Sequence, residues 1–375
     1  MKKKIAILTL RIHSNFGYLM QVYALQRYVR SLGHEPYTFY IKEEKPSIKA
    51  RVKEIVFNLF VKLFKGEQTA IFKRRLSEEE RGIIDKNTWD FVKKEIKLTD
   101  YLRSPKDFYS FDTSEYDAYI VGSDQVWREP YSISLPLYFF SFLDSEKKRM
   151  SYAASFGKSD INEYSQRQKK YCKELLQKFE LVTVRERDGV EICKNEFHVN
   201  AKQVVDPTLL LSASDYIKLS EKGKFHYYEE PYIFAYILDP NSYKLDIIEK
   251  FAKDNNLKVI NILPSKVIDK RKPLEKYVYP HVYDILSGFA NATFVFTDSF
   301  HASVFSIIFQ RQFLVFPNEK RGNSRIHSLL SDFDLGDRLI TGDAPRGLID
   351  YGSLNSSIDV KIIESKEYLN SFLNE

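Results

Sequence analysis

The amino-acid sequence predicts an α/β protein built from two doubly wound, Rossmann-like lobes. Short apolar runs alternate with segments of helical periodicity along most of the chain, a pattern typical of parallel sheets. This alternation is interrupted at the polar stretch 212–230 and then resumes. A length of 375 residues is typical of two domains. We therefore expect an N-terminal lobe over 1–215, a C-terminal lobe over 230–345 and a closing helix within 346–375.

The chain opens with a strand–helix–strand unit. An apolar run predicts a strand over Ile5–Leu10, and apolar residues at helical spacing predict a helix over Tyr18–Leu32 that ends at Gly33. Pro36–Ile41 is typical of a second strand. Such a unit implies a right-handed crossover and parallel strands.

The segment from about 42 to 110 differs in composition and is expected to be a basic, mostly helical insertion. It contains an apolar stripe formed by Ile55, Val56, Leu59, Phe60, Leu63 and Phe64, with Arg51, Lys53, Lys62 and Lys65 around it. A basic amphipathic helix of this kind can lie on an anionic membrane surface. It can equally pack on its own domain with its charged face in water, and the sequence leaves both roles open.

The remaining elements follow the same alternation. In the N-terminal lobe, further strands are predicted at Ala118–Val121, Ser151–Ser155, Leu181–Val184 and Gln203–Val205. In the C-terminal lobe, strands are predicted at Tyr232–Leu238, Lys258–Ile262, Thr293–Phe296 and Phe313–Phe316. Helices are expected around Tyr243–Asp254, Tyr283–Ala290 and Ser299–Phe309, and a last helix over Ile358–Leu373.

Composition narrows the class of protein. The 43% of hydrophobic residues is ample for packed cores, and the two cysteines are too few for a disulfide framework, which suits a reducing compartment. No apolar stretch reaches membrane-spanning length. We expect a cytoplasmic protein. Its net charge of +6 favours anionic substrates or an anionic membrane surface, whereas no zinc-finger or RNP-like pattern indicates nucleic acid. Histidine and cysteine are too dispersed to predict a metal site.

Ligands of open parallel sheets bind beyond the carboxyl ends of the strands, so the residues after each strand are the candidates for the site. Thr297, Asp298 and Ser299 form a helix-capping cluster that places His301 in the first helical turn. Free N–H groups there can bind an anion, and a bound phosphate would favour the imidazolium. His301 is therefore our candidate general acid. A structural role near the cap is the alternative.

Three other strand ends and one later position supply polar candidates. Arg185, after the strand Leu181–Val184, can bind a carboxylate or phosphate or can form an ion pair with Glu186. Arg325 is a further cation that can bind substrate or lie on the surface. The remaining candidates lie in or beside turns that follow strands, and each could have a simple capping role instead. They are Gly122, Ser123, Asp124 and Gln125 in one turn, and Asn15, Gly17 and Gln21 at the first turn and helix.

These residues carry a family resemblance. Six motifs occur in order: Asn15-Phe-Gly17 with Gln21 and Ala24-Leu-Gln26; Val121-Gly-Ser-Asp-Gln-Val-Trp127; Ser151-Tyr-Ala-Ala-Ser-Phe-Gly157; Val184-Arg-Glu186; Val205-Asp-Pro-Thr-Leu-Leu210; and Thr297-Asp-Ser-Phe-His301. Together they resemble the polysaccharide pyruvyl transferase family from the first strand to about Arg338. The family often has glycine where this chain has Ala302, and small residues where it has Tyr18 and Leu19.

The resemblance implies an architecture similar to glycosyltransferase-B, with substrates in the cleft between two lobes. It implies phosphoenolpyruvate as donor, a pyruvate ketal on a hexose as product, release of phosphate, and no metal or organic cofactor. We expect the acceptor to be a bacterial surface polysaccharide or its lipid-linked oligosaccharide precursor, and contact with the inner membrane face would suit it.

Each candidate residue then has an expected role. His301 would protonate the donor, Asp124 would orient or deprotonate an acceptor hydroxyl, and Arg185 and Arg325 would hold the donor's charges, assisted by the helix that starts near Ser299. Two alternatives remain open at this point: a glycosyltransferase that uses a nucleotide sugar, and a non-catalytic family member that binds an anion.

Overall fold

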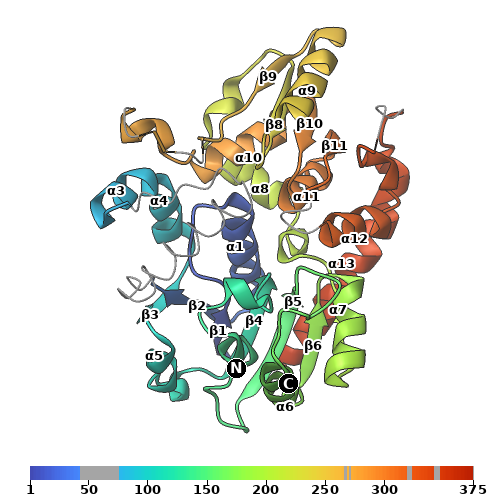
Figure 1. Cartoon of the computed structure of the whole chain (residues 1–375). Helices are drawn as coiled ribbons and strands as arrows, with labels where there is room; N and C mark the ends of the chain where they lie inside the picture. Colours follow the sequence, from blue (N-terminus) through green and yellow to red (C-terminus); the bar gives the residue numbers. More distant parts are fainter. Residues whose placement is uncertain (43–75, 266–267, 270–271, 319–322, 342–346, 375) are drawn as a thin grey trace, which may run out of the picture.

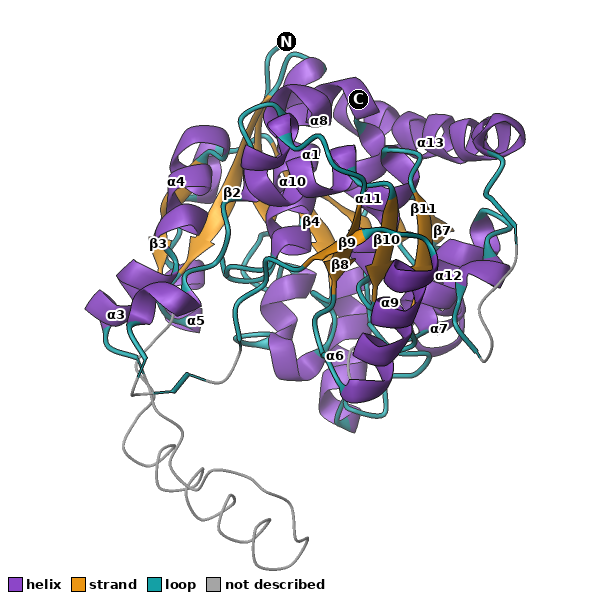
Figure 2. Ribbon diagram, turned by 90° about the horizontal axis from the view of Figure 1, so that it is seen from above, coloured by secondary structure: helices purple, strands orange, loops and turns teal. Residues whose placement is uncertain are grey.

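The computed structural model describes residues 1–42, 76–265, 268–269, 272–318, 323–341 and 347–374, and within them the chain forms two parallel sheets (Figure 1). The first has the order β3-β2-β1-β4-β5-β6-β7 and the second β11-β10-β8-β9. Helices lie on both faces of the sheets (Figure 2). The predicted class, α/β with two doubly wound lobes, is confirmed.

The strands agree closely with the predicted ones. The first sheet contains β1 (Lys4–Leu8), β2 (Glu35–Ile41), β3 (Leu98–Leu102), β4 (Ala118–Asp124), β5 (Lys148–Ala154), β6 (Leu181–Val184) and β7 (Lys202–Gln203). The second contains β8 (Tyr232–Tyr236), β9 (Lys258–Ile260), β10 (Phe294–Thr297) and β11 (Gln312–Val315). Because all strands of a sheet run the same way, their carboxyl ends meet at one edge.

The helices of the N-terminal lobe are α1 (Phe16–Ser31), α3 (Glu78–Ile84), α4 (Lys86–Glu95), α5 (Pro105–Tyr109), α6 (Gln166–Leu176) and α7 (Arg187–Ile192). The following helices are α8 (Ala213–Ser220), α9 (Ser242–Asp254), α10 (Val282–Asn291), α11 (Phe300–Ile308), α12 (Ser324–Asp332) and α13 (Tyr351–Asn374). Of these, α8 packs against α10 of the second lobe.

Helix α1 lies between the two lobes, and most of its residues are buried. The Asn15 side chain accepts a hydrogen bond from the Tyr18 N–H at 3.1 Å and caps its start. Beyond its end Gly33 has φ +89°, as the sequence predicted for the residue that stops this helix. Phe16 contacts two rings of the second lobe, Phe305 at 5.0 Å and Phe289 at 5.8 Å between centroids. One apolar core therefore runs through both lobes.

The prediction of a helical insertion over about 42–110 is wrong in one respect. Helices α3 and α4 do occur there, but Leu98–Leu102 forms β3, the edge strand of the first sheet, which pairs with β2. The sequence of β3, Leu-Thr-Asp-Tyr-Leu, is half polar because an edge strand is partly solvated, and a search for apolar runs passes over it. The apolar stripe at 55–64 lies outside the described residues.

The closing helix is longer than its predicted core, Ile358–Leu373, and returns to the N-terminal lobe as α13. Lys3 Nζ donates to the Leu373 carbonyl at 2.7 Å, and the Val205 N–H donates to Ser365 Oγ at 3.0 Å. The chain termini consequently lie near each other (Figures 1 and 2). Among the described helices, α13 included, none combines the length and apolarity needed to cross a membrane.

Candidate functional site

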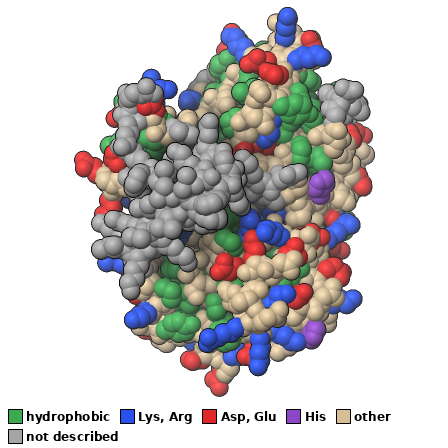
Figure 3. Space-filling view, in the orientation of Figure 1, with side chains coloured by type: hydrophobic (Ala, Val, Ile, Leu, Met, Phe, Trp, Pro, Cys, Tyr) green, Lys and Arg blue, Asp and Glu red, His purple; other side chains and the backbone are tan. Residues whose placement is uncertain are grey.

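A large cleft opens at the carboxyl edges of the two sheets. It has a volume of about 2240 Å³ and is lined by residues of both lobes. Its lining includes seven predicted site residues: Asn15, Asp124, Gln125, Asp298, Ser299, His301 and Arg325. Basic and acidic side chains are interspersed over the part of this face that the described residues form (Figure 3).

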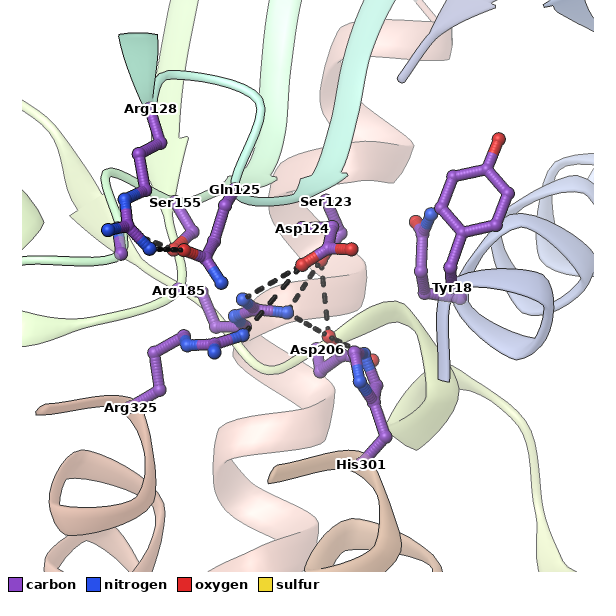
Figure 4. A network of polar contacts seen from close by, with 12 residues as sticks. Tyr18, Ser123, Asp124, Gln125, Arg128, Ser155, Arg185, Asp206, His301 and Arg325 are labelled. Carbon is purple, nitrogen blue, oxygen red and sulfur yellow. Dashed lines mark hydrogen bonds and ion pairs between the residues drawn. The ribbon is translucent and has the colours of Figure 1, made fainter. Parts of the chain in front are cut away.

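A cluster built from the ends of neighbouring strands lies at and just beneath the floor of the cleft, and of its members Asp124, His301 and Arg325 line the cleft. Asp124 is the last residue of β4, Arg185 follows β6, and Asp206 follows the segment after β7. The strand register brings Asp124 opposite Ala154, whose carbonyl accepts the Arg185 N–H at 3.1 Å. His301 and Arg325 reach this cluster from α11 and α12 of the other lobe (Figure 4).

Asp124 lies between two guanidinium groups. Its Oδ1 is 3.8 Å from Arg185 Nη2 and 3.8 Å from Arg325 Nη1. Its backbone has φ +71°, a left-handed conformation that aspartate tolerates better than most residues. Burial alone would raise the pKa of this carboxyl, but the charges of Arg185, His301 and Arg325 outweigh it and lower the pKa. Asp124 is therefore ionised at neutral pH.

Arg185 is held by carboxylates below the cleft surface. Its Nη1 donates to Asp206 Oδ2 at 2.9 Å, and its Nε donates to Glu186 Oε1 at 3.1 Å. Burial would lower the pKa of the guanidinium, but Glu186, Asp206 and Asp124 together raise it. Arg185 does not line the cleft. Of the two roles that the sequence left open for Arg185, the structure shows the ion pair with Glu186, within a larger network, and binding of a substrate anion stays a prediction.

Asp206 joins the two lobes at this point. Its Oδ2 accepts hydrogen bonds from Arg185 and from Ser123 Oγ, at 3.1 Å for the latter, and lies 3.5 Å from His301 Nε2. Its Oδ1 accepts from the N–H and hydroxyl of Thr208. Burial favours the neutral acid, but His301 and Arg185 hold the pKa of Asp206 far below its ordinary value. One buried carboxylate thus contacts a cation of the first lobe and the imidazole of the second.

His301 lies in the first turn of α11, as predicted, and is 6% exposed. Gly17 of α1 packs against its ring so closely that a Cβ at that position would come within 2.2 Å of Nδ1. Glycine is therefore required at position 17 for the imidazole to lie where it does. Ser299 precedes the helix without a side-chain capping bond, and Thr297 Oγ1 accepts the Ser299 N–H instead.

Arg325, unlike Arg185, lines the cleft. It is the second residue of α12, a helix that the sequence analysis did not predict. Burial and the nearby charge of Arg185 lower the pKa of its guanidinium to about 10. The ring of Phe300 lies 4.5 Å from the Arg185 guanidinium and 5.9 Å from that of Arg325. An aromatic face between two like charges offsets part of their repulsion.

The other predicted residues have supporting places. Asp298 accepts hydrogen bonds from the Leu238 and Asp239 N–H groups, Lys244 Nζ and Asn318 Nδ2, so its oxygens tie together three strand ends of the second lobe. Ser123 is buried on Asp206, and Gln125 Oε1 accepts from Arg128 at 3.0 Å. Gln21 is a buried residue of α1, Gly122 packs against Leu25 of the same helix, and neither lines the cleft.

Sequence reasoning missed three groups at the site. Asp206 directly follows a predicted strand, the same signal that indicated Asp124 and Arg185. Ser155 Oγ donates to Glu186 Oε1 at 2.7 Å and so supports the Arg185 network. His13 also lines the cleft, with its ring edge-to-face on Tyr18 at 4.5 Å. Burial lowers the pKa of His13, and the negative charge of Asp124 offsets part of this effect.

The family model of the polysaccharide pyruvyl transferases matches residues 15–320, a span that contains every one of the clustered groups except Arg325. The chain belongs to the polysaccharide pyruvyl transferase family. Membership supports a transferase. No curated protein matches the sequence.

Solved structures with some similarity to this pyruvyl transferase family member are remote. A putative UDP-N-acetylglucosamine 2-epimerase from Listeria monocytogenes shares 10% identity, with 98% of this chain and 90% of that chain covered and a TM-score of 0.47. The UDP-GlcNAc 2-epimerase from Neisseria meningitidis bound to UDP-GlcNAc shares 11%, with 99% and 93% covered and a TM-score of 0.46. The ADP-heptose lps heptosyltransferase II of E. coli shares 11%, with 100% and 98% covered and a TM-score of 0.37. Similarities this distant do not indicate a substrate.

Proposed function

We propose that this protein transfers the pyruvyl group of phosphoenolpyruvate to a hexose of a surface polysaccharide or of its lipid-linked precursor, forming a pyruvate ketal and releasing phosphate. The observation that carries the proposal is the cluster of Asp124, Arg185, Asp206, His301 and Arg325 at the cleft floor, in a chain of this family. It combines an imidazole, guanidinium groups and an ionised carboxylate, the chemistry that the reaction needs.

His301 is the proposed acid. The methylene carbon of phosphoenolpyruvate takes a proton from the imidazolium, which makes C2 electrophilic. The imidazolium is supported by Asp206, whose Oδ2 lies 3.5 Å from Nε2, and Gly17 against the other side limits the movement of the ring. Positioned acid–base groups of this kind contribute on the order of 10²–10⁴-fold to a rate.

The remaining steps need only phosphoenolpyruvate and two hydroxyl groups of the acceptor sugar, and their bonds and protons balance. A sugar hydroxyl adds to C2 and loses its proton, the bond from C2 to the phosphate oxygen breaks, and a second hydroxyl adds and loses its proton. One of the two hydroxyl protons replaces the proton that His301 gave to the methyl group. The other leaves on inorganic phosphate.

Arg325 and the start of α11 are the proposed site for the donor's negative charges. Arg325 lines the cleft. Within the part of the chain that the structure describes, no side chain caps the first turn of α11, so its N–H groups can bind an anion. Arg185 is enclosed by Asp206, Glu186 and Asp124 and is a positioning residue in this account. It keeps the carboxylates charged and in place.

Asp124 has an orienting role in the proposed reaction. A carboxylate whose pKa is lowered is a weak base, so it is poorly suited to remove a proton from a sugar hydroxyl. It is well suited to accept a hydrogen bond from that hydroxyl and to point its oxygen toward C2. Its place between Arg185 and Arg325 brings the acceptor next to the donor's charges.

The test is phosphate release from phosphoenolpyruvate with a panel of lipid-linked or synthetic galactosides, glucosides and N-acetylmannosaminides, alongside the same panel with nucleotide sugars as donors. We expect acceptor-dependent release of phosphate and a product heavier than the acceptor by one pyruvate ketal. Consumption of a nucleotide sugar without phosphoenolpyruvate turnover would replace the proposal with glycosyl transfer. Binding of phosphoenolpyruvate with no turnover of either donor on any acceptor would favour a non-catalytic role.

A further inference from the structure

The cleft continues well past the catalytic cluster along the N-terminal lobe. Its lining there includes Tyr40 of β2, Trp89 of α4 and, on α3, Glu78 and Arg81. Cavities that enclose drug-sized ligands have volumes of roughly 300–1,000 Å³. A volume of about 2240 Å³ therefore exceeds what the small donor and a single sugar ring need.

Two aromatic rings form a pair in this part of the cleft. The rings of Tyr40 and Trp89 lie 5.5 Å apart between centroids with an interplanar angle of 65°. Both side chains are partly exposed, and Trp89 packs its inner side against the core. The backbone that carries both rings is held in place, because the Tyr40 N–H donates to Thr99 Oγ1 at 3.2 Å and Phe91, on the same helix as Trp89, is fully buried. Rigid aromatic rings at a cleft surface lose little entropy when a ligand binds.

This combination of groups matches the chemistry of a sugar ring. A pyranose presents apolar C–H faces and a polar edge of hydroxyls, so it can pack on an aromatic ring while charged and amide groups bind its hydroxyls. Glu78 and Arg81, one of each charge, lie on the same stretch of lining. The mixed charges suit a neutral, hydroxyl-rich ligand better than a highly charged one.

We propose that Trp89 and Tyr40 form a subsite for a second sugar unit, so that the acceptor is an oligosaccharide and not a single sugar. This rests on the proposed function, because the sugar that reacts must lie at Asp124 and His301 while the next unit extends along the same cleft. The subsite fixes the length of acceptor that the protein prefers, independently of the donor.

The test uses the fluorescence of Trp89. The sequence contains two tryptophans, and the other, Trp127, is fully buried against Phe139, so Trp89 is the tryptophan that a ligand in the cleft can reach. The wild-type protein is titrated with galactose-, glucose- and N-acetylmannosamine-based oligosaccharides of one to four units and, separately, with UDP. We expect a saturable change in emission with at least one series, with affinity on the order of tenfold tighter for two or more units than for one.

Three variants make the result specific. Trp89→Phe should lose the emission change while keeping the thermal midpoint, and Tyr40→Ala, which keeps both tryptophans, should weaken binding of the longer sugars about tenfold. Tyr171→Ala is the matched control, since Tyr171 is an exposed tyrosine of α6 outside the cleft and should behave as wild type.

Phosphate release measured on the same samples separates the two proposals. A Trp89-dependent response to longer sugars supports the subsite even if no phosphate is released. No response to any sugar overturns the subsite, and phosphoenolpyruvate turnover in that protein would leave the proposed reaction standing. A Trp89-dependent response to UDP alone would overturn both.

Discussion

The two lobes meet through two regions of opposite character. Behind the cleft, the rings of Phe16, Phe289 and Phe305 stack in a continuous apolar core. At the cleft floor, Asp206 and His301 meet across the lobes as charged or polar groups. The first contact gains free energy from burying apolar surface, whereas the second buries ionisable groups at a cost in desolvation that their partners must offset.

The difference indicates that the two contacts between the lobes have separate roles. The apolar contact holds the lobes in one arrangement, so the polar contact can keep a demanding geometry without having to stabilise the fold. The close approach of Gly17 to His301 fits this view, because a shift of the lobes by an ångström would separate α1 from α11. Misplacement of that size can reduce a rate by about 10²-fold.

The largest expected effect comes from breaking the apolar contact. Phe289→Ala removes a fully buried ring that contacts Phe16, Phe234 and Phe305, and large-to-small changes of this kind cost about 3–5 kcal/mol. We expect a loss of that size in the free energy of unfolding in urea. Because one core spans both lobes, the protein should still unfold in a single transition. Two separate transitions, with one of them unchanged by the substitution, would show that the lobes are independent.

A smaller effect is expected at the polar contact, and it depends on pH. The pKa of Asp206 is lowered in the folded protein, so the unfolded chain binds the proton more readily and stability falls as pH falls below about 4, the ordinary value for aspartate. Asp206→Asn should cost about 1–3 kcal/mol at pH 7, because hydrogen bonds to a charged group are lost. It should also flatten the acid limb of a plot of unfolding free energy against pH. An acid limb as steep as that of the wild type would mean that other carboxylates control acid unfolding.

The sequence predicted the fold well because its central strands are short apolar runs bounded by turn residues. The rule that ligands bind at strand ends then located Asp124, Arg185 and His301 in one cluster, although they are far apart in the chain. The rule does not say whether a side chain near a strand end points into the cleft or into the core. Gly122 and Gln21 lie next to site residues in sequence but face the core, and Asp298 uses its oxygens to hold neighbouring loops.

The parts that the sequence did not predict depend on long-range partners. The sequence left Arg185 either to bind substrate or to pair with Glu186, and its hydrogen bond to Asp206, 21 residues later, follows only from the fold. The strand β3 and the helix α12 lack the strong apolar pattern of their neighbours, the first because it is an edge strand and the second because it is short and half polar. That these segments form a strand and a helix becomes evident only from the sheet and the cleft beside which they lie.

The most direct test of the central claim, that the polar contact between the lobes is the catalytic centre, is acceptor-dependent phosphate release from phosphoenolpyruvate in His301→Ala. The matched control is His327→Ala, since His327 is an exposed histidine on α12 that does not line the cleft. We expect a loss of about 10²–10⁴-fold in kcat/KM for His301→Ala, an unchanged thermal midpoint within a few degrees, and near wild-type activity for the control. A His301→Ala protein that is folded and retains activity within tenfold of the wild type would contradict the claim.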